Sequence, residues 1–187
     1  APRRYRRGIP GRIGPDGREI SALDETVVTE QVAQLIDEGI DTLAVSFLFA
    51  FLNPVHERRV REIVRTRWPE LPISLSSDVD PTFREYERTL VTAFDAYIKP
   101  IVNDYLFQLE TEIAKAGITA TVRIMQSRGG LTSCEVARKR PVRLFLSGPA
   151  AGVIGGQHEG QQAGLDDLIT VDIGGTSCDI SMISKAK

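Results

Sequence analysis

The residues best suited to chemistry lie in the run Val171-Asp-Ile-Gly-Gly-Thr-Ser-Cys-Asp-Ile180. A β-branched strand leads into two glycines and two hydroxyl residues, and a second strand follows. Glycines at a turn between strands let backbone N–H groups point into one concavity, which binds phosphate oxygens. Thr176 and Ser177 add hydroxyl donors, while Asp172 and Asp179 can hold Mg2+ through water or orient an attacking group. A plain β-hairpin with a glycine turn fits the same spacing, so both interpretations stay open.

Other chemistry has weaker support. The chain has no GxxxxGK[ST] loop and no GxGxxG motif that opens a helix. Cys134 and Cys178 lie far apart without a nearby histidine, which favours bystander cysteines over nucleophiles, a zinc site or a disulfide scaffold. His56, close to the start of an expected helix, is a candidate metal ligand or general acid/base. An exposed or hydrogen-bonded histidine is the preferred interpretation.

A group of alternating charges surrounds Tyr86. At helical spacing Arg84 and Arg88 share a face, while Glu85 lies elsewhere. Arginines in this arrangement suit a charged substrate or subunit surface, because guanidinium groups pair with carboxylate or phosphate. A solvated helix start with local ion pairs explains the same pattern equally well.

The composition of the 187 residues is that of an ordinary globular protein, with 42% hydrophobic and 26% charged residues. A net charge of -2 argues against a general binder of nucleic acid or anionic membranes. Residues 1–20 carry six arginines against Asp16 and Glu19, a local balance of +4, but their glycines favour a solvated loop or hairpin. No run of 18 apolar residues occurs, so no membrane partner is expected, and the cysteine usage suits a reducing cytoplasm.

Helix and strand patterns alternate along the chain. Asp24 and Ser133 are expected helix caps, Pro100 is expected to break or kink a long helix, and Ile101 and Tyr105 open an expected buried stripe. The expected helices cover residues 24–39, 53–68 and 81–116, a short segment after 133, and a Gly/Ala-rich segment after 147–149. The expected strands cover residues 42–47, 73–77, 121–125, 142–146, 168–173 and 180–183. This alternation predicts an α/β fold in which helices flank a layered sheet with parallel strands.

Five motifs in order resemble the hydantoinase A/oxoprolinase family, which includes the A-type component of N-methylhydantoinase and the β component of acetone carboxylase. They are LFAFLNPVHERRV (48–60), FREYERT (83–89), IMQSRGGL (124–131), LSGPAAGV (146–153) and DIGGTSCDIS (172–181). The resemblance implies a partial actin-like ATPase fold of the ribonuclease H-like type. It also implies that ATP activates the carbonyl of a cyclic amide, such as a hydantoin or 5-oxoproline, for ring opening, or of a ketone for carboxylation. A B-type hydantoinase subunit or domain is the implied partner, and a homo-oligomer is possible.

The same resemblance assigns roles to individual residues, with ATP and Mg2+ as cofactors. Asp172 and Asp179 become catalytic carboxylates, and Asp172 also holds Mg2+ through water. The implied phosphate-binding residues are Gly174, Gly175, Thr176 and Ser177. Phe49, Arg128 and Cys178 depart from the family pattern, in which histidine, a small polar residue and threonine are usual. Phe49 thereby weakens any two-histidine metal site that would include His56.

The resemblance also predicts domains. Residues 1–80 would end the N-terminal region and residues 81–187 would begin the ATPase core, so the chain is expected to be an internal piece with half a nucleotide site. No turnover is then expected from this piece alone. A nucleotide-gated conformational module and a small-molecule kinase of the actin-like superfamily are the alternatives.

Overall fold

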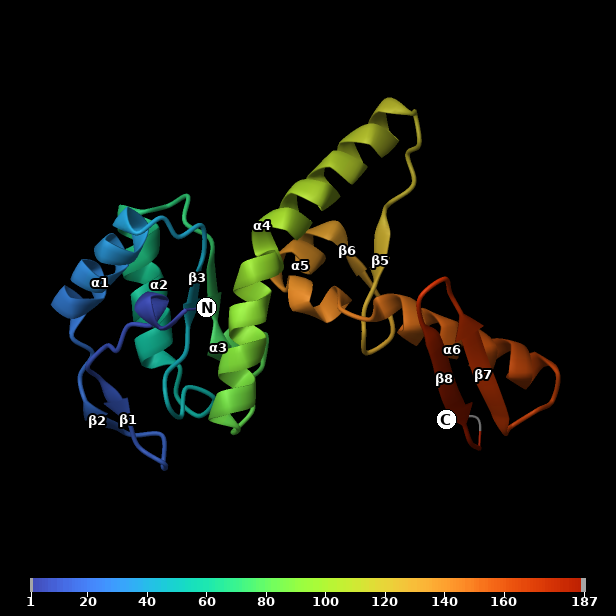
Figure 1. The fold of residues 1–187 in the computed structure, drawn as a ribbon, viewed down its shortest axis with the longest axis horizontal. Coiled ribbons are helices and arrows are strands. Elements are labelled where there is room, and N and C mark those ends of the chain that lie inside the picture. The colour runs from blue at the N-terminus through green and yellow to red at the C-terminus, as the bar shows by residue number, and fades with distance from the viewer. Residues whose placement is uncertain (1, 186–187) are drawn as a thin grey trace. The chain divides into compact units, whose positions relative to one another are not determined.

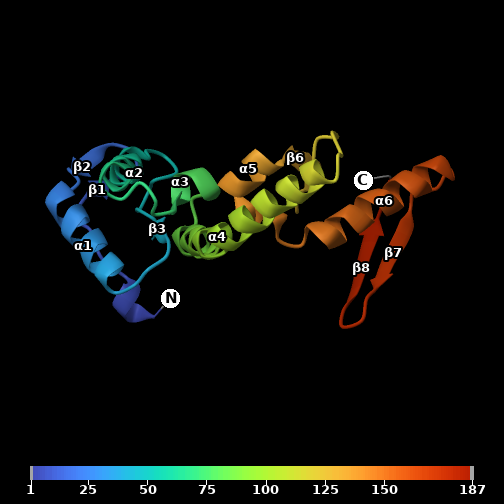
Figure 2. The same cartoon turned by 90° about the horizontal axis from the view of Figure 1, so that it is seen from above.

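The computed structural model describes residues 2–185, which form two compact units that divide at residue 104. Unit 1, residues 1–104, contains a βαβ arrangement in which β3 (Leu43–Val45) and β4 (Ile73–Leu75) pair in parallel. The connection between them is α2 (Val55–Arg67), as parallel strands require a crossover. The preceding helix, α1 (Glu25–Asp37), lies beside α2 in both ribbon views (Figures 1 and 2).

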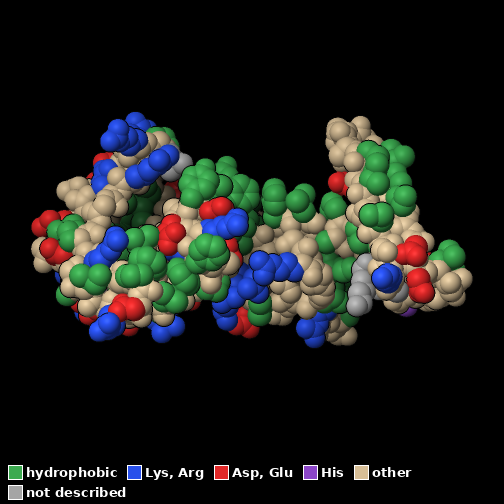
Figure 3. All heavy atoms as spheres, turned by 90° about the horizontal axis from the view of Figure 1, so that it is seen from below, with side chains coloured by type: hydrophobic (Ala, Val, Ile, Leu, Met, Phe, Trp, Pro, Cys, Tyr) green, Lys and Arg blue, Asp and Glu red, His purple; other side chains and the backbone are tan. Residues whose placement is uncertain are grey.

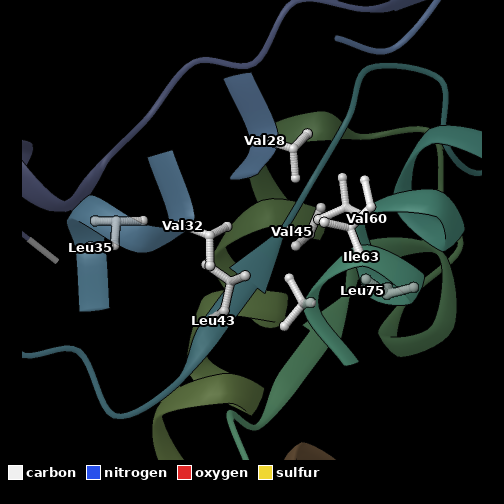
Figure 4. Close-up of a cluster of buried hydrophobic side chains, with 9 residues drawn as sticks. Val28, Val32, Leu35, Leu43, Val45, Val60, Ile63 and Leu75 are labelled. Carbon is white, nitrogen blue, oxygen red and sulfur yellow. The ribbon is translucent and has the colours of Figure 1, made fainter. Parts of the chain in front are cut away.

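The core of unit 1 is built from the inward faces of these elements. Figure 4 shows the side chains of α1 and α2 meeting those of the two strands. The buried members are Val28, Val32, Leu35, Leu43, Val45, Val60, Ile63, Val64 and Leu75. Burying apolar area of this kind is the main favourable contribution to folding, about 25 cal/mol per Å2.

Local signals in unit 1 agree with the sequence expectations. The carboxylate of Asp24 accepts a hydrogen bond from the Val27 N–H at 3.0 Å and caps α1. The arginine-rich start forms a short 3-10 helix, η1 (Arg3–Tyr5), and an antiparallel hairpin of β1 (Arg12–Ile13) and β2 (Glu19–Ser21). The hairpin confirms the preferred interpretation of residues 1–20.

Several expectations for the middle of the chain are wrong. The strand expected to reach residue 77 ends at Leu75, and the short helix α3 (Ser76–Val79) follows. The helix α4 (Glu85–Lys115) is not broken at Pro100, so of the two expected outcomes only a kink near Lys99 remains as a prediction. The expected buried stripe also fails, since Ile101 and Tyr105 are exposed.

Unit 2, residues 105–187, holds the end of α4 and two antiparallel hairpins. The first hairpin pairs β5 (Arg123–Met125) with β6 (Leu131–Ser133), after which Ser133 caps α5 (Cys134–Lys139) through the Val136 N–H. The strand expected at residues 142–146 is instead a 3-10 helix, η2 (Pro141–Leu144). A proline at the first position favours this turn, and the Arg143 carbonyl accepts from Ser127 rather than from a strand.

The last elements of unit 2 are α6 (Ser147–Gln162) and the hairpin of β7 (Leu168–Ile173) and β8 (Cys178–Ile183). The molecule is therefore α/β as predicted, although its strands form four two-stranded pairs, of which only β3–β4 is parallel within the described residues. Among residues 2–185 no helix is both long and apolar enough to span a bilayer.

Candidate functional site

The β7–β8 hairpin carries the glycine-rich run as a four-residue turn between two six-residue strands. Six pairs of residues lie opposite one another, and the Gly174 N–H donates to the Ser177 carbonyl at 2.9 Å to close the turn. This order of strand, turn and strand is the one predicted from the sequence. The structure extends the second strand back to Cys178.

Asp172 and Asp179 lie directly opposite one another in the hairpin register. Residues paired in this way have Cβ atoms about 4.5–5.5 Å apart on the same face of the sheet. Both side chains are exposed, and neither forms an ion pair within the described part of the chain. Two opposed carboxylates repel each other, so a divalent cation between them would stabilise the pair.

The backbone of the turn leaves donors available. Neither Gly174 nor Gly175 has a positive φ, and a Cβ at Gly175 would meet no atom within 4 Å. The chain's own conformation and packing therefore do not demand these glycines. Across residues 2–185 the Gly175 and Thr176 N–H groups donate no hydrogen bond, so they and the hydroxyls of Thr176 and Ser177 can receive an anion.

The hairpin rests on α6 through glycines. A Cβ at Gly156 would lie 2.4 Å from the Thr170 Cγ2, and one at Gly160 would lie 2.3 Å from the Leu168 Cδ2. Since side chains alternate along a strand, Asp172 is on the same face of the hairpin as Thr170 and Leu168. Close packing is thus the role that the structure shows for these two glycines of α6.

The opposite face of the hairpin is apolar and exposed. Figure 3 shows hydrophobic side chains gathered on the hairpin, which projects at the upper right of that view. The residues are Ile169, Val171, Ile173, Ile180 and Met182. The two faces therefore differ: one packs on α6 and carries the aspartate pair, and the other is uncovered in the described chain.

His56 lies in unit 1 and is buried, with 2% of its surface exposed. Its Nε2 lies 2.7 Å from Glu19 Oε1, and its ring meets Phe47 edge-on, with the ring centroids 5.6 Å apart. Among residues 2–185 no three His, Cys, Asp or Glu side chains are placed to hold a metal. The described contacts thus fit the hydrogen-bonded histidine that was preferred, although the ring is not exposed.

The charged group around Tyr86 is divided by the start of α4. Arg84 precedes the helix and is exposed, 3.7 Å from Glu87, and Glu85 is the first helical residue. Arg88 is fully buried and donates to Ser76 Oγ, the Thr82 carbonyl and the Phe47 carbonyl. The expectation that the two arginines share an open face does not hold, because Arg88 is committed to the chain's own acceptors.

A buried carboxylate that was not predicted from the sequence completes this network. Glu57 accepts hydrogen bonds from the Phe47 N–H at 2.9 Å, from Ser76 Oγ at 2.5 Å and from the Ser77 N–H at 2.8 Å. Through Ser76 it is linked to Arg88. The proximity of Glu57 to His56 in the LNPVHE motif was the only signal available, and it did not distinguish a structural from a catalytic carboxylate.

Comparisons with known proteins agree with the motifs. The model of the hydantoinase/oxoprolinase family matches residues 88–187, and that of the hydantoinase/oxoprolinase N-terminal region matches residues 1–68. The domain boundary expected near residue 80 remains a prediction. The alpha subunit of the caprolactamase of Pseudomonas jessenii is 37% identical over 181 residues, 97% of this chain and 26% of that protein. The beta subunit of the acetone carboxylase of Xanthobacter autotrophicus is 30% identical over 190 residues, 100% of this chain and 26% of that protein.

Two solved structures share this fold. The ATP-dependent caprolactamase of Pseudomonas jessenii matches with a TM-score of 0.89 and 37% identity, over 96% of this chain and 26% of that one. The nucleotide-free acetone carboxylase, whose carboxylation is ATP-dependent, matches with a TM-score of 0.83 and 29% identity over the same shares. The chain spans about a quarter of the length of these relatives.

Proposed function

Because the chain belongs to the hydantoinase/oxoprolinase family, we propose that it forms part of an ATP-dependent enzyme that activates a carbonyl group. The β7–β8 turn would bind the phosphates of ATP, and Asp172 would hold Mg2+ through water. The observation that carries this proposal is the pairing of Asp172 with Asp179 beside a turn whose N–H groups remain available. The ATP dependence of the two structural relatives supports it.

The residues of the turn fit these cofactors. Mg2+ is usually bound by one or two carboxylates, with waters and phosphate oxygens completing its shell, so the aspartate pair needs no third protein ligand. Prearranged N–H donors stabilise phosphate charge without reorganisation during the reaction. ATP supplies the phosphoryl group for carbonyl activation. The role of this chain would be to bind the ATP phosphates through Gly175, Thr176 and Ser177 and to orient them with the two carboxylates.

For the carbonyl substrate we propose a cyclic amide that is opened by hydrolysis. The 37% identity with one component of a caprolactamase supports this reaction, as does the 34% identity over 177 residues with the 5-oxoprolinase of Saccharomyces cerevisiae. The second candidate is ATP-dependent carboxylation, which the acetone carboxylase relative favours. Both reactions need an activated carbonyl oxygen, so the same phosphate turn suits either.

We further propose that a second subunit or domain of B type completes the reaction. Two of the relatives are themselves parts of larger enzymes, one of a caprolactamase and the other of an acetone carboxylase. Turnover is therefore expected only when this protein is produced together with that partner. Full turnover by the purified protein alone would show that no B-type subunit is required.

The nucleotide proposal is tested by Asp172→Asn in the full-length enzyme. We expect a fall in MgATP turnover of about 100-fold or more, because the Mg2+ that would neutralise the developing phosphate charge loses the carboxylate that holds it. Asp166→Asn is the matched control, since Asp166 is exposed in the loop before β7 and makes no described contact. Equal turnover of both variants, with equal folded yield, would show that the turn is only a hairpin.

The reaction class is tested with the unmodified enzyme and two sets of substrates, cyclic amides and a ketone with bicarbonate. ADP release that depends on a hydantoin, 5-oxoproline or caprolactam, with formation of the ring-opened product, supports hydrolysis. ADP release that depends on a ketone together with bicarbonate supports the carboxylase. Accumulation of a stable phosphorylated product would instead indicate a kinase and contradict both candidates.

A further inference from the structure

Unit 2 contains a strongly basic segment that the proposed nucleotide site does not use. Residues 121–150 carry six basic side chains and only Glu135 as an acid, a local balance of +5 in a chain whose net charge is -2. They include the motif IMQSRGGL and the start of LSGPAAGV, neither of which has an assigned role. Like the basic charge of residues 1–20, this local charge is hidden by the nearly balanced composition of the whole chain.

Two of these basic residues already have acidic partners. Arg138 pairs with Glu110 at 2.6 Å, and Lys139 pairs with Glu135 at 2.6 Å. The other cationic side chains of the segment have no carboxylate partner among residues 2–185. Three of them, Arg128, Arg140 and Arg143, form what we call the arginine cluster.

The fold brings the arginine cluster together. Ser127 donates to the Arg143 carbonyl from both its N–H, at 2.7 Å, and its hydroxyl, at 2.9 Å, which fastens the β5–β6 turn to η2. Burial lowers the pKa of the Arg143 guanidinium, and the positive charges of Arg140 and Arg128 lower it further. No carboxylate of the described chain opposes this effect, so the three charges are held near one another without a counterion.

The same region presents backbone donors. The helix α6 begins four residues after Arg143, has no acidic residue in its first turn and has no side-chain cap. Pro149 has no N–H and the Ala150 N–H donates to the Leu146 carbonyl, so the N–H groups of Ser147 and Gly148 are the ones that can receive an anion. The helix dipole favours negative charge there. The β5–β6 turn also contacts this helix, since a Cβ at Gly129 would lie 2.9 Å from the Ile154 Cδ1.

We propose that the arginine cluster and the N-terminus of α6 bind a small oxyanion, the phosphate or carboxylate group of a metabolite. Guanidinium groups recognise both groups through paired N–H donors, and closely spaced arginines without carboxylates are stabilised when an anion neutralises them. The proposal does not depend on the nucleotide site at the β7–β8 turn.

The test measures binding of inorganic phosphate, and separately of glutarate, to the full-length protein by calorimetry at low ionic strength. Arg128→Asn removes an exposed charge and should weaken saturable binding about tenfold, as expected for one charge-assisted contact. Arg123→Gln is the matched control, because Arg123 is an exposed arginine of β5 that does not affect the pKa of Arg143. The Arg123→Gln variant should bind phosphate and glutarate as tightly as the unmodified protein does. Tighter binding of phosphate or of glutarate identifies which oxyanion the site prefers.

Adding Arg143→Gln to Arg128→Asn should abolish the binding that remains in the single variant. The proposal would be overturned by the absence of saturable binding of either probe, or by equal weakening of binding in Arg123→Gln. Asp172→Asn separates the two proposed sites, because phosphate binding should persist in it. Loss of phosphate binding in Asp172→Asn would place the anion at the glycine turn and not at the arginine cluster.

Discussion

Replacement of Gly156 by alanine tests how the hairpin is held on α6. The added methyl would lie 2.4 Å from Thr170 Cγ2 and 3.6 Å from Thr170 Cβ. Threonine is branched at Cβ and restricted in χ1, so its methyl cannot turn away easily and the hairpin or the helix must shift. Such overpacking costs about 1–3 kcal/mol.

The neighbouring glycine supplies the control. Gly155 is exposed, and a Cβ there meets nothing within 4 Å. Alanine in place of glycine gains about 1 kcal/mol of helix propensity at both positions. The difference between Gly155→Ala and Gly156→Ala therefore isolates the steric cost, which should lower the unfolding free energy of Gly156→Ala by about 1–3 kcal/mol relative to Gly155→Ala.

Thermal unfolding, together with hydrogen exchange of the β7 and β8 amides, measures this difference. For a protein of this size, 1 kcal/mol corresponds to about 2–4 °C in Tm. Thr170→Ser removes the opposing methyl while keeping the hydroxyl, so the double variant with Gly156→Ala should recover most of the loss. If Gly156→Ala is as stable as Gly155→Ala, or if Thr170→Ser gives no recovery, the close packing of α6 on the hairpin is refuted.

Two further predictions concern buried groups. Arg88→Gln should lower the unfolding free energy by about 3 kcal/mol or more, because buried acceptors lose a charged donor. Arg84→Gln, the control, should change it by less than about 0.5 kcal/mol when both variants are compared by chemical denaturation. Similar losses in both variants would contradict the buried role of Arg88. Burial, together with the charge of Glu110, raises the pKa of the Cys134 thiol. At pH 8 iodoacetamide should therefore label the exposed Cys178 and spare the buried Cys134 until the protein unfolds, as measured by mass spectrometry. Faster labelling of Cys134 than of Cys178 would be evidence against this burial.

The features that the sequence predicted are those with local causes. The caps at Asp24 and Ser133 each need only a hydroxyl or carboxylate three residues before a free N–H. The β7–β8 hairpin follows from a glycine-rich turn between two β-branched strands. In both cases the interacting groups lie within a few residues, so no knowledge of the tertiary fold was required.

The features that the sequence did not predict depend on distant residues. Helical spacing placed Arg84 and Arg88 on one face, but α4 begins after Arg84 and the acceptors of Arg88 come from Phe47, Ser76 and Thr82. The strand expected after Pro141 is replaced by η2 because a loop residue, Ser127, takes the carbonyl that a neighbouring strand would have used. Tertiary partners, rather than local propensity, decided these outcomes.

The aspartate pair connects the packing of α6 to the proposed chemistry. A two-stranded hairpin is marginally stable in water by itself, so the register that places Asp172 opposite Asp179 needs support from one of its faces. Within residues 2–185 that support comes from α6, through the glycines that admit Leu168 and Thr170. A cation held between two carboxylates is sensitive to their separation. The methyl added in Gly156→Ala should consequently lower MgATP turnover as well as stability, and Thr170→Ser should restore both together.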